Sequence, residues 1–275
     1  IGRKGGVYGV TKRLQQRFGA GRVMDSLLDE QSILGLAIGA AHNGLLPIPE
    51  IQFLAYLHNA EDQLRGEAAT LPFFSNGQFA NPMVVRVAGL GYQKGFGGHF
   101  HNDNSLAVLR DIPGVILCCP SNGRDAVLML RECVRLAWQE QRVVVFLEPI
   151  ALYGTRDVDS EGDGAWAQVY PAPEERARFG DVAVRDGEGL AIVSYGNGFY
   201  LSCQAAAVLE AETGVRPRLV DLRWLQPLPV EALLRALEGI EAVLVVDECR
   251  RSGNVAEGLV TALSEAGLNR TARLS

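Results

Sequence analysis

Short apolar runs recur along the chain, and most are followed by a turn and then by a segment with helical spacing of its apolar residues. A continuous apolar run is typical of a strand that is buried on both faces of a sheet. We predict strands at residues 45–50, 83–87, 115–119, 143–147, 190–195, 218–222 and 242–247. We predict helices at residues 33–41, 55–69, 105–110, about 124–138, 201–212, 229–237 and 254–266. Because strands and helices alternate, the pattern predicts an α/β fold with largely parallel sheets.

The alternation is interrupted between residues 151 and 189, and residues 155–164 read as a polar linker or an exposed excursion. We therefore predict two doubly wound, largely parallel-sheet domains, at residues 1–174 and 175–275. A second irregular stretch, rich in glycine and histidine, separates the strand at 83–87 from the helix at 105–110. It is too long to be only a connection, which is typical of functional loops.

Composition narrows the class of protein. The 275 residues are 48% hydrophobic and 21% charged, with a mean hydropathy of +0.07. These values exclude a disordered chain, a collagen and a coiled coil. The net charge of −6 argues against nucleic acid as the main partner. No apolar stretch is long enough to cross a membrane, so we expect no membrane association.

The basic residues and the cysteines point to a cellular setting. Only three of the 26 basic residues are lysine, a bias typical of GC-rich bacterial genomes. The five cysteines include no C-x-x-C pair, which favours reduced core thiols in the bacterial cytoplasm. Cys118 and Cys119 are adjacent in a predicted strand, so their side chains should face opposite sides.

Six segments carry a resemblance to a known family. They read GGVYGVTKRLQQRFGAGRVMDSLLDE, ILGLAIGAAHNGLLPIPEI, HNDNSLAVLRDIPGVILCCPSNGRDA, VVVFLEPIALY, VDLRWLQPLP and VLVVDECRRSGNVAEGL. In this order and at these spacings they resemble the β subunit of the thiamine-diphosphate-dependent decarboxylating component of 2-oxo acid dehydrogenase complexes. The resemblance covers nearly the whole chain. It implies a transketolase-like pyrimidine-binding domain at residues 1–174 and a transketolase C-terminal-like domain at residues 175–275.

The resemblance also implies segments beyond both ends of this sequence. Family members carry a strand and a helix before the GGVYG segment, and their second domain continues further. We therefore expect the first domain to be incomplete at its N-terminus and the second at its C-terminus. The chain would be a trimmed fragment or part of a longer polypeptide, with its α half either fused or separate.

Glu30 is the candidate catalytic and cofactor-binding carboxylate. Thiamine catalysis needs a carboxyl group hydrogen-bonded to the cofactor's aminopyrimidine, and an apolar setting helps such a group to exchange a proton near neutral pH. Glu30 has Leu27, Leu28 and Leu34 near it in sequence, and it precedes Gly35 by five residues, as the family's catalytic glutamate does. Without the resemblance, an acidic residue here would be a helix cap, the role that we assign to Asp29.

Tyr56 is the candidate aromatic ring for the face of the aminopyrimidine. It lies six residues after Glu50, where the family places that aromatic side chain. Phe53 and Leu54 are adjacent candidates for the pocket wall. The alternative for Tyr56 is a core tyrosine on a helix.

His101 is the second candidate catalytic residue. The family has a histidine twelve residues before the proline of its P-G-hydrophobic strand, here Pro113. An imidazole can stabilise an anionic oxygen or assist acyl transfer to lipoamide. His99 is a candidate for the same substrate channel. Many relatives read His-Ser-Gln where this chain reads His101-Asn102-Asp103, a departure that bears on substrate and activity.

We predict no metal site in this chain. Gly162-Asp163-Gly164 resembles the start of the superfamily's magnesium–diphosphate motif, but it sits in a polar linker. The motif should follow a buried strand and precede a helix, so we interpret the match as coincidence. The cofactor diphosphate and its Mg²⁺ would then be held by the partner half.

The sequence therefore predicts a half enzyme that decarboxylates a 2-oxo acid and transfers the acyl group to lipoamide. Its expected partners are an α subunit or fused α region, a second copy of itself and the lipoyl domain of an acyltransferase. One alternative is a transketolase-like ketol transferase fragment, which would need more basic residues for sugar phosphates. The other is a non-catalytic assembly module.

Overall fold

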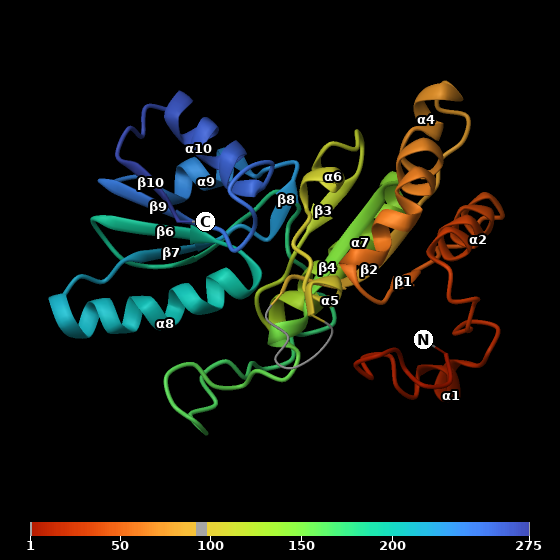
Figure 1. The fold of residues 1–275 in the computed structure, drawn as a ribbon, viewed down its shortest axis with the longest axis horizontal. Coiled ribbons are helices and arrows are strands. Elements are labelled where there is room, and N and C mark those ends of the chain that lie inside the picture. Colours follow the sequence, from red (N-terminus) through yellow and green to blue (C-terminus); the bar gives the residue numbers. More distant parts are fainter. Residues whose placement is uncertain (1, 92–97, 275) are drawn as a thin grey trace.

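In the computed structural model, two five-stranded sheets lie side by side (Figure 1). The structure describes residues 2–91 and 98–274, without the side chains of residues 99 and 100. The first sheet contains, in spatial order, β1 (Glu50–Ile51), β2 (Met83–Gly89), β4 (Val143–Pro149), β3 (Ile116–Cys118) and β8 (Trp224–Gln226). The second contains β10 (Thr271–Leu274), β9 (Ala242–Val246), β6 (Leu190–Ser194), β7 (Arg218–Asp221) and β5 (Ala183–Arg185). Both sheets are mostly parallel, which confirms the predicted fold class.

Helices surround the first sheet and cover both of its faces. They are α1 (Leu14–Phe18), α2 (Glu30–His42), α3 (Leu54–Leu57), the 3₁₀-helix η1 (His58–Ala60), the π-helix η2 (Gln63–Ala69), α4 (Leu71–Phe74), α5 (Gly98–His101), α6 (Ala107–Arg110), α7 (Gly123–Glu140) and the 3₁₀-helix η3 (Ile150–Leu152). Every residue of β2 and β4 is buried. Alternate residues enter different apolar clusters: Val85 belongs to one and Val84 to the other. This burial on two faces explains why both strands read as continuous apolar runs.

The second sheet carries α8 (Gly196–Thr213), α9 (Val230–Ala236) and α10 (Val255–Glu265). Its strands β7, β6, β9 and β10 are parallel, and β5 adds an antiparallel edge. Helix α8 begins at Gly196, five residues before the predicted start at residue 201, so Gly196-Asn197-Gly198 forms its first turn. Gly196 has a φ of +54°, and a Cβ at position 198 would lie 2.5 Å from Ser194 Oγ, so both glycines fit this start.

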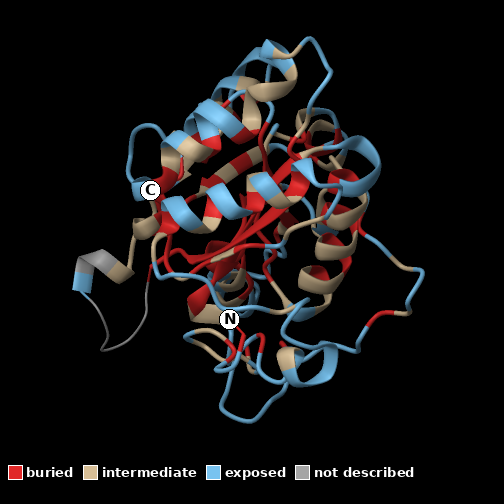
Figure 2. Cartoon of the chain, turned by 90° about the vertical axis from the view of Figure 1, so that its right-hand side faces the viewer, coloured by how far each residue is buried: buried red, intermediate tan, exposed pale blue. Residues whose placement is uncertain are grey.

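The two sheets share one apolar core. Val87 of β2 and Val193 of β6 belong to the same buried cluster, and Figure 2 shows the buried strands enclosed by helices with exposed outer faces. Strand β8 lies in the C-terminal part of the sequence, yet it pairs with β3 of the first sheet. The buried Asp125 at the start of α7 receives two hydrogen bonds from Arg223, of 2.6 and 3.2 Å. The C-terminal part is therefore firmly attached to the first sheet.

Some predicted elements are wrong in detail. Of the strand predicted at residues 45–50, only Glu50 lies in a strand. Pro47 and Pro49 accept hydrogen bonds from β2 through their carbonyl groups, but proline has no N–H to donate in return. The helix predicted at 55–69 is divided into α3, η1 and η2. The structure thus keeps these segments beside the sheet without regular pairing or a continuous α-helix.

The cysteines behave as core residues. All five are free and buried. Cys118 packs with Cys133 in one apolar cluster and Cys119 lies in the other, which confirms their predicted opposite orientation. Burial raises the pKa of the Cys118 and Cys119 thiols, so these two groups stay protonated and unreactive at neutral pH. Across the described residues, we find no helix with the length and hydropathy of a membrane span.

Candidate functional site

Tyr56 and His101 are brought into direct contact. Tyr56 lies in α3, at the carboxyl end of β1, and His101 ends the short helix α5. A hydrogen bond of 2.9 Å joins Tyr56 Oη and His101 Nε2. The ring of Phe53 packs edge-on against both, with centroid distances of 5.5 Å to Tyr56 and 4.4 Å to His101. The three rings form one aromatic cluster from segments 45 residues apart in the chain.

Glu30 is the first residue of α2 and is 8% exposed. Asn59 Nδ2 donates a hydrogen bond of 3.4 Å to Glu30 Oε2. Among the described residues this long contact is the one hydrogen bond of the Glu30 side chain. Asn59 lies in η1, three residues after Tyr56. The α3–η1 segment therefore contacts Glu30 through Asn59 and His101 through Tyr56. The carboxyl group is buried but keeps acceptor positions that no side chain fills in the described structure.

Asp29 is the N-cap of α2, as predicted. Its carboxylate accepts a hydrogen bond of 2.8 Å from the backbone N–H of Ser32. Hydrogen bonds from Ser32 lower the pKa of Asp29, which keeps the cap charged. The two neighbouring acidic residues are therefore in different situations, because Asp29 satisfies the helix end and Glu30 does not.

The apolar surroundings expected for Glu30 are only partly formed within this chain. Leu34 is buried, but Leu27 and Leu28 are 75% and 73% exposed. Both precede α2, and within the described residues no element packs over them. Of these three leucines, only Leu34 thus contributes to a buried apolar setting for Glu30. His99 is part of α5, but its side chain lies outside the described residues, so its predicted place in the channel is untested.

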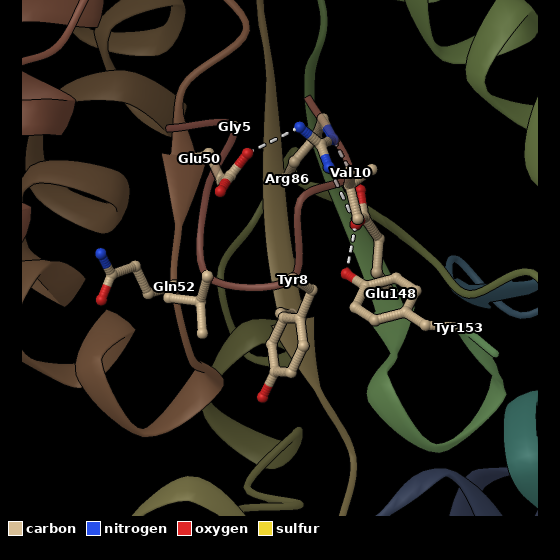
Figure 3. A pocket seen from close by; sticks show the side chains of 10 residues that line it. Gly5, Tyr8, Val10, Glu50, Gln52, Arg86, Glu148 and Tyr153 are labelled. Atoms are coloured by element: carbon tan, nitrogen blue, oxygen red, sulfur yellow. Dashed lines mark hydrogen bonds and ion pairs between the residues drawn. The ribbon is translucent and has the colours of Figure 1, made fainter. Parts of the chain in front are cut away.

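A buried ion-pair cluster lies close to the carboxyl ends of β2 and β4 (Figure 3). Arg86 contacts Glu148 through Nε and Nη2, at 2.6 and 2.9 Å, and contacts Glu50 through Nη1 at 2.9 Å. Tyr153 donates a hydrogen bond of 2.5 Å to Glu148. Burial acts to lower the pKa of Arg86, but the hydrogen bond and charge of Glu148 outweigh it and the pKa is raised. Sequence reasoning missed this cluster, although charges inside the apolar strands are a signal for a buried pair.

In the Gly162-Asp163-Gly164 segment, the carboxylate of Asp163 is hydrogen-bonded to the backbone of its own loop. Asp163 accepts hydrogen bonds from the backbone N–H groups of Val158, Asp159, Ser160 and Ala165. The bonds from Ala165 and Ser160 contribute most to lowering its pKa to about 2. Its oxygens therefore order a turn of this loop. Within the described residues, no group of three or more His, Cys, Asp or Glu side chains could hold a metal ion.

Comparisons with known proteins identify the family of the chain. Residues 3–155 match the transketolase pyrimidine-binding domain family, and residues 181–274 match the transketolase C-terminal domain family. The chain is 33% identical to the 2-oxoisovalerate dehydrogenase subunit beta of Pseudomonas aeruginosa, over 96% of this chain and 75% of that protein. This chain belongs to the family of 2-oxo acid dehydrogenase β subunits.

A second relative extends the comparison. The family also includes the pyruvate dehydrogenase E1 component subunit beta of Bacillus subtilis, 30% identical over 98% of this chain and 78% of that protein. Relatives named for two different oxo acids are thus similar to nearly the same extent, so the comparisons define the family and not the substrate. A solved structure described as a split gene transketolase, inactive beta4 tetramer, has a TM-score of 0.73 at 20% identity. It covers 97% of this chain and 80% of its own, and confirms the fold.

The sequence analysis missed Asn59 and the contacts of Asp103. Asn59 could have been found, because a residue three positions after Tyr56 shares its helical face. The contacts of Asp103 could not have been found from sequence spacing. They come from His58 and from Arg250, 45 and 147 residues away.

Proposed function

We propose that this chain is the pyrimidine-binding half of a thiamine-diphosphate-dependent 2-oxo acid dehydrogenase. The enzyme would decarboxylate a 2-oxo acid and transfer the acyl group to the lipoyl domain of an acyltransferase. The observation that carries the proposal is the contact between Tyr56 and His101, formed by the same α3–η1 segment that touches the buried Glu30. When bound, thiamine diphosphate would supply the carbanion that attacks the oxo acid and the electron sink for loss of CO₂.

The residues of the chain fit that cofactor at its aminopyrimidine end. Glu30 would bind the pyrimidine ring through the carboxyl oxygens that lack a close partner, and would hold or release a proton there. The aromatic cluster of Phe53, Tyr56 and His101 offers apolar ring surface for the flat heterocycle. His101 would also present an imidazole N–H to a substrate oxygen, with its orientation set by the hydrogen bond to Tyr56.

The other end of the cofactor would be held by the α half. The oxygens of Asp163 are engaged by backbone N–H groups, so they are not available as ligands for Mg²⁺. A hard cation and a diphosphate need oxygen and backbone ligands that we assign to the partner.

An apolar groove beside α2 supports a permanent partner. The groove is lined by exposed apolar side chains from the N-terminal segment, from α2 and from the segment that leads to β1: Met24, Leu27, Leu28, Leu36, Leu45 and Ile48. A contiguous apolar surface of this kind marks an interaction site. We propose that an α half and a second copy of this chain cover it, in an α₂β₂-like assembly with the active sites between subunits.

The test is turnover by the assembled protein. This chain, co-purified with its α half and supplied with thiamine diphosphate and Mg²⁺, should release CO₂ from 2-oxo acids. It should then acylate an added lipoyl domain. Turnover of phosphorylated ketoses in place of 2-oxo acids would favour the transketolase-like alternative. No turnover of either substrate class, with cofactor shown to be bound, would identify an assembly module.

A further inference from the structure

Each residue of the segment 102–105, which follows His101, takes part in a side-chain hydrogen bond. Asn102 Nδ2 donates a hydrogen bond of 2.7 Å to the carbonyl of Gly98. Asn104 Oδ1 accepts one of 2.6 Å from the N–H of Gly91, and Asn104 Nδ2 donates one of 2.8 Å to the carbonyl of Glu248. Glu248 belongs to the connection between β9 and α10. Asn104 therefore links the segment that follows β2 to the segment that follows β9.

Asp103 is the centre of this arrangement. It is largely buried, with a side chain 12% exposed, and its Oδ2 lies 2.9 Å from His58 Nε2. Its Oδ1 accepts hydrogen bonds from Ser105 Oγ at 2.6 Å and from Arg250 Nη2 at 3.4 Å. Arg250 Nη1 also donates to Ser105 Oγ, at 2.5 Å. Burial acts to raise the pKa of Asp103, but the hydrogen bonds from Ser105 and His58 outweigh it, and the pKa is lowered.

The spacing of these contacts links Asp103 to the candidate catalytic pair. His58 lies two residues after Tyr56, and Asp103 lies two residues after His101. The contact between His58 and Asp103 therefore runs beside the contact between Tyr56 and His101, at the same distance of 2.9 Å. A shift of Asp103 along α3–η1 would displace His101 from Tyr56, because only Asn102 separates the two residues.

We propose that Asp103 is a positioning residue, and that the C-terminal domain acts on the active site through Arg250, which holds Asp103 and thereby orients His101. The inference rests on the proposed function for its kinetic consequence. It gives the C-terminal domain a role at the site beyond assembly. It also assigns a purpose to the His101-Asn102-Asp103 sequence, since an aspartate can pair with both an imidazole and a guanidinium.

The kinetic test uses the assembled enzyme with cofactor and Mg²⁺. Asp103→Asn should lower kcat about tenfold, because a misplaced catalytic group loses rate steeply with distance. Arg250→Met should lower kcat about threefold at little change in KM, and Arg250→Lys should restore part of the loss. The control is Arg251→Met. Arg251→Met removes the same charge at the adjacent position. The exposed side chain of Arg251 makes no hydrogen bond or ion pair with the described residues.

The His101→Ala background separates positioning from a general structural role. If Asp103 and Arg250 act through His101, their substitutions should cause no further loss of kcat in that background. Equal losses with and without His101, or an equal loss in Arg251→Met, would overturn the proposal.

Amide hydrogen exchange tests the contact without reference to activity. In the same complex, Arg250→Met and Asp103→Asn should speed exchange across residues 101–106 by about tenfold, while Arg251→Met should not. Unchanged exchange in both variants would overturn the positioning role. Faster exchange in an enzyme that turns over no 2-oxo acid would uphold the contact and reject the proposed function instead.

Discussion

Two carboxylates of the first domain are equally buried but differ in the hydrogen bonds that they accept. Glu30 and Glu148 are each 8% exposed. Glu148 accepts hydrogen bonds from Arg86 at 2.6 and 2.9 Å and from Tyr153 at 2.5 Å, whereas Glu30 has Asn59 at 3.4 Å. A buried carboxyl group with full pairing is costly to unpair, and one with a single long contact has acceptor positions open to a ligand. The comparison therefore favours a structural role for Glu148 and supports the binding role that we propose for Glu30.

The largest expected effect is on activity. Glu30→Gln keeps the size of the side chain but cannot exchange a proton. We expect 2-oxo acid turnover by the assembled enzyme to fall by about 10²–10⁴-fold, the range for loss of acid–base catalysis. The midpoint of thermal unfolding should stay within the range of the matched control Glu67→Gln, a glutamate with an exposed side chain. Comparable kcat values for the two variants would remove the distinction between Glu30 and other acidic residues.

The opposite result is expected for Arg86. Arg86→Met leaves Glu50 and Glu148 buried without their cation, which should cost about 3–5 kcal/mol in the free energy of unfolding. The measurement is urea unfolding of the assembled protein. Arg65→Met breaks an exposed pair with Asp111 and should cost no more than about 1 kcal/mol. A cost as small as that of Arg65→Met would show that the buried cluster is not structural.

A third carboxylate sharpens the comparison by its pH dependence. Asp221 is fully buried, and burial with the nearby charge of Asp125 raises its pKa to about 7. Since the folded protein binds this proton more tightly than the unfolded chain, the group stabilises the fold at low pH. The contribution is lost as the pH rises from about 4 to about 7, at no more than about 1.4 kcal/mol per pH unit. Unfolding free energies of Asp221→Asn should lack this part of the slope, and identical slopes would contradict the assignment.

The smallest effect is expected at Tyr153. Tyr153→Phe removes one of three hydrogen bonds to Glu148 while the pair with Arg86 remains, so the free energy of unfolding should fall by about 1 kcal/mol. Burial and the charge of Glu148 raise the pKa of Tyr153, so its hydroxyl remains a donor across the accessible pH range. Tyr170→Phe, at an exposed tyrosine, is the control and should leave stability unchanged. A larger loss than in Arg86→Met would reverse the order of importance within the cluster.

The fold was predictable where local pattern and tertiary structure agree. The apolar runs of β2 and β4 and the amphipathic helix α7 follow directly from the sequence. The pattern failed where the partner lies far away along the chain. Strand β8 has three residues and pairs with β3, more than 100 positions earlier, so no local periodicity marks it. At residues 45–50 the local pattern was misleading. The apolar run resembled a strand, but Pro47 and Pro49 have no N–H to donate to a neighbouring strand.

The site was predictable only in part. The resemblance to a family named Glu30, Tyr56 and His101, and the structure shows that Tyr56 and His101 touch. No sequence pattern could show that Leu27 and Leu28 are exposed, since the exposure of a side chain depends on how distant parts of the structure pack. The contact of Arg250 with Asp103 is likewise a product of how the two domains pack.

The most direct test of the central claim, that Glu30 is open because it binds the aminopyrimidine, is proton exchange at C2 of bound thiamine diphosphate. The assembled wild-type enzyme and the Glu30→Gln variant are loaded with cofactor, mixed with D₂O and quenched over time. We predict that exchange in the variant falls by at least about 10²-fold, the scale of a lost acid–base group, with the cofactor still bound. Exchange at the wild-type rate in Glu30→Gln would contradict the claim.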